Sequence, residues 1–197
     1  MDIRPVTLTG RFIRLEPLSE AHVPALAAIG LHNSIWQFMV YGEMHNEADM
    51  RAWVVDLLER QKAGGDLPFV VFHLGDKQIA GATRYLNIDQ DNRTLEIGGT
   101  WYGLSYQRTV VNTESKYLLL RYAFEELGCV RVQFKTDSRN LRSQKAIERL
   151  GAVKEGVLRN HMILADGYLR HSVYYSILPE EWPQVKAHLE QKLKQSR

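Results

Sequence analysis

The sequence predicts an α+β domain in which a mixed, mostly antiparallel central sheet is flanked by helices. Three strand-like runs at 68–74, 78–88 and 94–104 are separated only by short turns, which is typical of an antiparallel meander. A further strand-like run at 130–137 follows a helical stretch, and such a crossover makes strand pairing parallel. Because no linker or internal repeat divides the chain, we expect a single domain over 1–197.

Before the meander, the pattern predicts one strand and two helices. The run RFIRLEPL at 11–18 alternates imperfectly and ends at Ser19, a helix N-cap residue type, so a helix is expected over 19–30. A second helix begins at Asn46 and ends at Gly64-Gly65. Its apolar residues recur at helical spacing: Met50, Trp53, Val54, Leu57 and Leu58.

After the meander, the pattern predicts a helix that Gly128 ends, then the 130–137 strand. The next helix runs from the N-cap Asn140 to Gly151. Two strands around 152–163 and 168–178 are joined by the hairpin signal ADG. A charged final helix carries apolar residues on one side: Trp182, Val185, Leu189 and Leu193.

Composition excludes several classes of protein. The chain has 45% hydrophobic and 24% charged residues, which fits a globular rather than a disordered chain. No apolar run approaches the roughly 18 residues of a membrane span, and the start lacks the apolar segment of a secretory signal. We therefore expect a cytoplasmic protein without a membrane partner. The single cysteine, Cys129, is interpreted as a core thiol.

Motifs for nucleotide hydrolysis, zinc chemistry and nucleophile-elbow hydrolysis are missing, so no metal is expected. The net charge of +2 is too small to imply nucleic acid. Basic residues nevertheless gather in 139–159, opposed only by Glu148 and Glu155. An anionic ligand, a solvated helix face and an RNA or ribosomal surface are alternatives for this segment, although it lacks the interleaved aromatic residues of single-strand binders.

The stretch YGLSYQRTVVNTESK at 102–116 runs from a strand into a helix, whose first-turn amides can bind phosphate. Two polar residues elsewhere stand out. Glu96, beside the strand-breaking pair Gly98-Gly99, is either a general base or a solvent-facing residue. Ser143 lies on the apolar stripe of its helix, and its hydroxyl either bonds back to the preceding turn or serves a ligand.

Together these segments resemble the GNAT superfamily of acyl-CoA-dependent N-acetyltransferases, in particular the RimJ/RimL-like branch of ribosomal-protein alanine N-acetyltransferases. The likeness extends from RFIRLEPL to VYYSI and is most specific in 95–128 and 130–159. It implies the GNAT fold and direct transfer of an acetyl group from acetyl-CoA, the cosubstrate, to a primary amine. The acceptor would be a protein N-terminus or a small-molecule amine, and family analogy adds a homodimer.

The resemblance also assigns roles to residues. Glu96 would deprotonate the amine, and Ser143 would serve the departing thiolate. In the family, the turn Q/R-x-x-G-x-G/A binds pyrophosphate through its amides, and both of its small residues are replaced here, by Val110 and Asn112. The predicted cofactor-binding residues are Trp101, Tyr102, Gln107, Arg108, Thr109, Val110, Val111, Asn112, Thr113, Asn140, Arg142 and Lys145.

The predicted acceptor pocket mixes apolar and cationic groups: Trp36, Phe38, Met39, Tyr41 and Arg84. His171 stands where relatives often carry an acidic residue, so it is included as a substrate residue. A helical Val110 would leave the phosphate site intact, whereas a left-handed conformation would not suit a β-branched residue. Val110→Gly is predicted to tighten acetyl-CoA binding, and unchanged or weaker affinity would show that glycine is not what the site lacks. The rival function is a non-catalytic GNAT-fold CoA-binding module.

Overall fold

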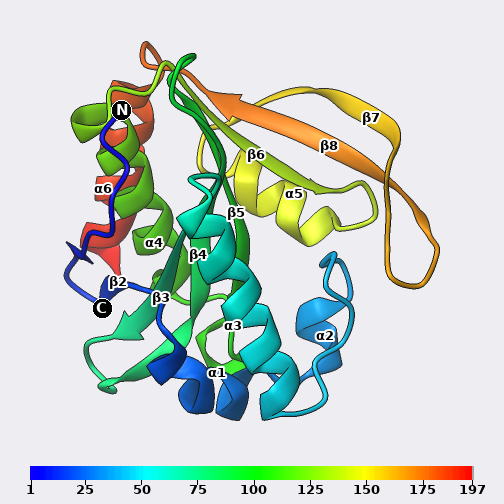
Figure 1. The fold of residues 1–197 in the computed structure, drawn as a ribbon. Helices are drawn as coiled ribbons and strands as arrows, with labels where there is room; N and C mark the ends of the chain where they lie inside the picture. Colours follow the sequence, from blue (N-terminus) through cyan, green and yellow to red (C-terminus); the bar gives the residue numbers. More distant parts are fainter. Residues whose placement is uncertain (197) are drawn as a thin grey trace.

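The computed structural model describes residues 1–196, which form an eight-stranded sheet with helices on both faces (Figure 1). The strands lie in the order β1-β2-β3-β4-β5-β6-β8-β7. Among the strands of residues 1–196, only β5 and β6 pair in parallel, which confirms the predicted fold class and crossover. The strands are β1 Leu8–Thr9, β2 Ile13–Pro17, β3 Leu67–His73, β4 Gln78–Asp89, β5 Thr94–Tyr102, β6 Arg131–Asp137, β7 Val153–Ile163 and β8 Leu169–Ile177.

The helices divide between the two faces of the sheet, and each set encloses its own hydrophobic cluster. One face carries α1 Val23–Gly30 and α3 Glu47–Lys62, and the segment between them includes the short helix α2 Asn33–Trp36. The other face carries α4 Val110–Arg121, α5 Leu141–Glu148 and α6 Trp182–Gln195. We refer to these as the α3 face and the α4 face.

Local signals set most of the element boundaries. Asn46 and Asn140 cap α3 and α5, and their side-chain oxygens accept hydrogen bonds from Asp49 N and Ser143 N, each at 3.0 Å. The predicted helix over 19–30 is divided, because Glu20–His22 form a 3₁₀ turn before α1 begins at Val23. Strand β1 and helix α2 were not predicted, since both are too short to show a period.

The pair Gly98-Gly99 interrupts the β4–β5 ladder, as the sequence predicts. Ala82 pairs with Trp101 and Arg84 with Gly98, so Thr83 on β4 stands opposite two residues on β5. Gly99 has a φ of +55°, which suits glycine. Beyond this bulge, alternate β5 side chains are re-aimed: Thr100 faces α4, and Trp101 packs in the cluster of the α3 face.

The two parallel strands separate after a short contact. Pairing between β5 and β6 covers only 94–96 and 131–133, whereas β5 continues to pair with β4, and β6 with β8. The inner edges of both strands are therefore unpaired beyond Glu96 and Gln133. This separation creates an opening through the sheet, between the α3 face and the α4 face.

Glu114 on α4 fixes the start of the sheet. Its buried carboxylate accepts hydrogen bonds from the backbone N–H groups of Arg11, Phe12 and Ile13, at 2.7–2.8 Å. These contacts fix the turn between β1 and β2 against α4. Cys129 is buried in the same core, which confirms its interpretation as a core thiol.

Candidate active site

A cleft of about 1340 Å³ occupies the opening between β5 and β6. Its lining includes residues from both faces of the sheet: the start of α4 and most of α5 on one side, and α2 with the following loop on the other. A channel of this shape admits two different molecules from opposite faces. The volume exceeds the usual range for small-ligand pockets, which fits an extended ligand plus a second reactant.

The turn that was predicted to bind phosphate leads directly into α4 despite its missing glycine. Val110 is the first residue of α4, and the positive φ of the turn, +63°, falls on Arg108 instead. Thr109 caps the helix, and its hydroxyl accepts from Val111 N at 3.3 Å. The remaining first-turn amides have no intrahelical partner. Of the two alternatives for Val110, the helical one holds, so nothing remains to suggest that Val110→Gly tightens binding.

The predicted cofactor residues gather around this turn. Gln107 links it to both neighbouring elements, because its amide donates to Tyr102 O at 3.1 Å and accepts from Arg142 Nη2 at 2.7 Å. Asn140 caps α5 with Oδ1, which leaves its amino group for a ligand. The cations Arg108, Arg142 and Lys145 line the same part of the cleft. This donor set suits the phosphates of a nucleotide cofactor.

Ser143 lies in the cleft on the α4 face. Within residues 1–196 its hydroxyl makes no hydrogen bond, so the alternative in which it bonds back to the preceding turn does not hold. The hydroxyl is available to a ligand.

Glu96 lies on the opposite side of the opening and is 2% exposed. Its Oε2 accepts from Asn87 Nδ2 at 3.0 Å and from Gln133 Nε2 at 2.9 Å, and Lys135 Nζ lies 3.5 Å away. Its other oxygen, Oε1, has no hydrogen-bond partner within the residues that the structure describes. Since Glu96 lines the cleft, the solvent-facing alternative does not hold, and a carboxylate oxygen is free to accept a proton.

The wall around Arg84 lies on the α3 face. The guanidinium of Arg84 is 3.2 Å from Asp66 and donates to the hydroxyl of Tyr41, over whose ring it also lies. Burial raises the pKa of Asp66, although Arg84 opposes that effect. The buried pair fixes Arg84 at the edge of the cleft.

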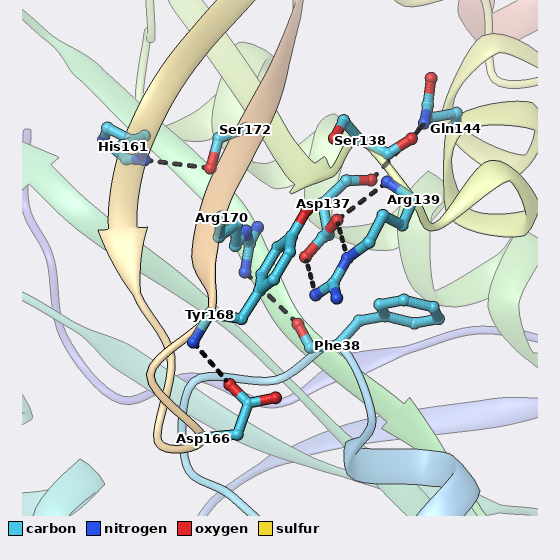
Figure 2. A network of polar contacts seen from close by, with 10 residues as sticks. All are labelled: Phe38, Asp137, Ser138, Arg139, Gln144, His161, Asp166, Tyr168, Arg170 and Ser172. Atoms are coloured by element: carbon cyan, nitrogen blue, oxygen red, sulfur yellow. Dashed lines mark hydrogen bonds and ion pairs between the residues drawn. The ribbon is translucent and has the colours of Figure 1, made fainter.

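A second polar network lies beside Phe38 on the same face of the sheet (Figure 2). The guanidinium of Arg139 lies 3.5 Å from the centre of the Tyr168 ring and 5.7 Å from that of Phe38. Arg139 also donates to both oxygens of Asp137, at 3.1 and 2.9 Å. Burial works to raise the pKa of Asp137, but the hydrogen bonds from Arg139 outweigh it, so the pKa is lowered. Arg170 donates to Phe38 O at 3.3 Å.

Two of the predicted substrate residues, Trp36 and His171, lie outside the cleft. Trp36 is 1% exposed, donates to Gly30 O and packs in the core, so it does not line the cleft. His171 also lies outside the cleft, where it accepts from Asn160 N, because neighbouring strand residues point to opposite faces. The side chains of Val110 and Val111 do not line the cleft, and the prediction for these residues concerned their backbone amides, so it stays a prediction.

Sequence reasoning missed two buried cations in the cleft, Arg170 and Lys116. Arg170 directly precedes His171, and strand alternation places it on the cleft side. Lys116 lies on α4 among buried residues and is 7% exposed. Its position three and four residues before the apolar Leu119 and Leu120, on the predicted core-facing side of the helix, was the available signal. The basic segment 139–159 is divided: Arg142, Lys145 and Arg149 line the cleft, and Lys154 and Arg159 are exposed on β7.

Two kinds of feature are missing from residues 1–196. No helix there has the length and apolarity needed to cross a membrane. No group of three or more histidine, cysteine or acidic side chains is arranged to hold a metal ion in that range.

Comparisons with known proteins agree with this geometry. The family model described as "Acetyltransferase (GNAT) domain" matches residues 13–153. The Bacillus subtilis protein "Putative ribosomal N-acetyltransferase YdaF" is 35% identical over 109 residues, which cover 55% of this chain and 58% of that protein. That alignment thus spans less than two thirds of the relative.

Solved structures extend the likeness to nearly the whole chain. A crystal structure of a "putative acetyltransferase" from T. thermophilus is 41% identical with a TM-score of 0.90, covering 98% of this chain and 100% of the other. Mycobacterium smegmatis RimJ in complex with CoA-disulfide has a TM-score of 0.81 at 22% identity, covering 96% and 95%, and shares the fold.

Proposed function

Because this chain belongs to the GNAT acetyltransferase family, we propose that it transfers the acetyl group of acetyl-CoA directly to a primary amine. The observation that supports this most is the channel through the sheet, which has a phosphate-binding helix end on the α4 face and the buried Glu96 on the α3 face. Acetyl-CoA would bind from the α4 face, and the amine from the α3 face.

The residues present fit the cosubstrate. The amides at the start of α4 and the cations Arg108, Arg142 and Lys145 would hold its phosphates. The free amino group of Asn140 and the unpaired inner edge of β5 offer hydrogen bonds to its extended arm. The Tyr102 carbonyl already accepts a hydrogen bond from Gln107, so the arm of the cosubstrate would contact other backbone groups of β5.

Direct transfer is favoured over an acyl-enzyme. The chain has one cysteine, Cys129, and burial raises its pKa to about 11. Cys129 lies in the core rather than in the cleft. Glu96 would accept the proton of the attacking amine, since an ammonium group has no lone pair with which to attack.

We propose a protein N-terminus as the acceptor class. The name of the relative YdaF refers to ribosomal N-acetylation, and the α3-face wall suits a peptide. Phe38 and Tyr41 offer apolar contact there, and Arg84 and Arg170 are positioned to donate to peptide carbonyls. The rival function, a non-catalytic CoA-binding module, rested on Val110 and His171. Since Val110 is helical and His171 lies outside the cleft, neither observation favours it any longer.

The test measures CoA release with a thiol reagent on peptides that begin with alanine or serine, with polyamines and free amino acids as comparison acceptors. We expect turnover on the peptides and a loss of about 100-fold or more in kcat for Glu96→Gln. Acetyl-CoA affinity, measured by calorimetry, should stay within about twofold in that variant. Failure of the wild type to bind acetyl-CoA at millimolar concentration would refute the proposal, and binding without CoA release on any acceptor would favour the rival.

A further inference from the structure

Lys116 is a buried cation that the function described above leaves unused. It projects from α4 toward the sheet, where Nζ donates to Thr100 Oγ1 at 2.5 Å and to Thr83 Oγ1 at 3.5 Å. The two hydroxyls are themselves 2.8 Å apart. Lys116 and Thr100 both line the cleft at the bulge in β5, beyond the point where β5 separates from β6.

The surroundings of Lys116 hold no compensating charge. The strands packed against it present Thr83 from β4 and Thr100 from β5, and within residues 1–196 no acidic side chain forms an ion pair with it. Lysine is almost never fully buried unless it is paired, so a structural role alone does not explain its presence. Burial lowers the pKa of Lys116 to about 7.

The bulge in β5 separates Lys116 from Glu96, because Thr100 lies four residues after Glu96 and plain alternation would place both side chains on one face. Glu96 contacts Gln133 and Lys135 on the α3 face, whereas Thr83 and Thr100 turn toward α4. Under the proposed function, the amine attacks from the α3 face while the sulfur of CoA stays attached to an arm that extends along the α4 face. Lys116 therefore lies on the side of the leaving group, and Glu96 on the side of the nucleophile.

We propose that the Lys116 ammonium protonates the sulfur of the departing CoA, with Thr100 holding the ammonium in place. The amine nitrogen forms a bond to the thioester carbonyl carbon, and its proton passes to Glu96. The carbon–sulfur bond then breaks, and the electron pair stays on sulfur, which takes a proton from Lys116. Both side chains afterwards exchange protons with water, so the enzyme returns to its starting state.

The acidity of this group suits the step. A thiol with a pKa of about 8.5 is a stronger base as thiolate than an amine whose conjugate acid has a pKa near 7, so the transfer is downhill. Ser143 is positioned to donate a hydrogen bond to the same sulfur. It does not carry a proton that it can release near neutral pH, so the two residues have separate roles.

The test compares the kcat/KM for acetyl-CoA of the wild type with that of Lys116→Met, using one acceptor peptide from pH 6 to pH 9. In the ratio of wild-type to variant kcat/KM, the titrations of the acceptor and of Glu96 cancel because both enzymes share them. We expect a ratio of about 100 at pH 6.5 that falls about tenfold per pH unit above pH 7, because only the protonated lysine acts. The matched control Ser143→Ala should show a ratio that does not change with pH, as should any variant with a purely structural defect.

Thermal unfolding at each pH verifies that both variants are folded. A ratio for Lys116→Met that is independent of pH, or below about threefold at pH 6.5, overturns the role of Lys116 while leaving the proposed function standing. This inference rests on that function. If the wild type releases no CoA from acetyl-CoA, both the proposed function and the role of Lys116 are overturned. If the wild type is active, the Lys116→Met result tests the role of Lys116 alone.

Discussion

Replacement of Lys116 by methionine should stabilise the protein, and the gain should depend on pH. Methionine keeps the length of the side chain and removes the ammonium group. Burial lowers the pKa of Lys116 from 10.5 to about 7, so the folded protein binds this proton less tightly than the unfolded chain does. The free energy of unfolding of the wild type therefore rises as pH increases from about 7 toward 10.5. Below pH 7 the destabilisation from burying the charged ammonium is fully present.

The size of the effect follows from these two pKa values. At about 1.4 kcal/mol per pKa unit, burial of the ammonium costs about 5 kcal/mol at pH 6 and about 2 kcal/mol at pH 9. Loss of the hydrogen bonds to Thr83 and Thr100 costs the variant about 1 kcal/mol at either pH. The stability gain of Lys116→Met should therefore shrink by about 3 kcal/mol between pH 6 and pH 9.

Urea unfolding followed by tryptophan fluorescence measures this difference. The packed rings of Trp36, Trp53 and Trp101 provide the signal, with centroids 5.3–5.9 Å apart. Lys62→Met is the control, since Lys62 is exposed on α3 and its pair with Glu59 contributes little. A gain for Lys116→Met that is equal at pH 6 and pH 9 within about 1 kcal/mol would refute the reasoning, because the ammonium would then not be buried without compensation.

Three further predictions concern the turn, the sheet and the acceptor wall. Arg108→Gly should add about 1 kcal/mol of stability by relieving the positive φ, yet weaken acetyl-CoA binding about tenfold by calorimetry; unchanged stability would contradict the assigned backbone conformation. Glu114→Ala should cost about 3 kcal/mol or more in urea unfolding, because three backbone donors lose their acceptor, whereas exposed Glu180→Ala should cost almost nothing. Arg139→Ala should raise the KM for the acceptor severalfold and leave acetyl-CoA affinity unchanged, since it frees Phe38 from its partner; an unchanged KM would show that the network does not shape the acceptor wall.

The spacing of apolar residues and the residue types at turns were enough to predict most of the fold. The meander turns, the helix start at Asn46 and the cap Asn140 are local signals, and each lies where it was expected. The parallel crossover followed from the strand–helix–strand order. The ladder break at Gly98-Gly99 was also predicted, because two adjacent glycines in a strand have few other uses. The short elements β1 and α2 left no such signal, since their place is set by contacts with distant residues.

The candidate site was predicted only in part, because spacing along the chain says which residue types are near a turn but not which face they occupy. Glu96, Gln107 and Asn140 do line the cleft, and Trp36 and His171 do not. An aromatic side chain near a binding loop packs in the core as often as it lines the cleft, and Trp36 packs in the core. For a strand residue, an error of one position exchanges the two faces of the sheet, which is how Arg170 was missed.

The amino-acid sequence by itself determined that this chain is an α+β domain of the GNAT type, and it predicted a phosphate-binding turn before α4. Only the tertiary structure decided that the turn places its positive φ on Arg108 and leaves Val110 helical. It also decided that Glu96 and Lys116 lie on opposite sides of one opening. The physical reason is that strand separation and the bulge at Gly99 depend on pairing between segments far apart in the chain, and this pairing sets which way each side chain points.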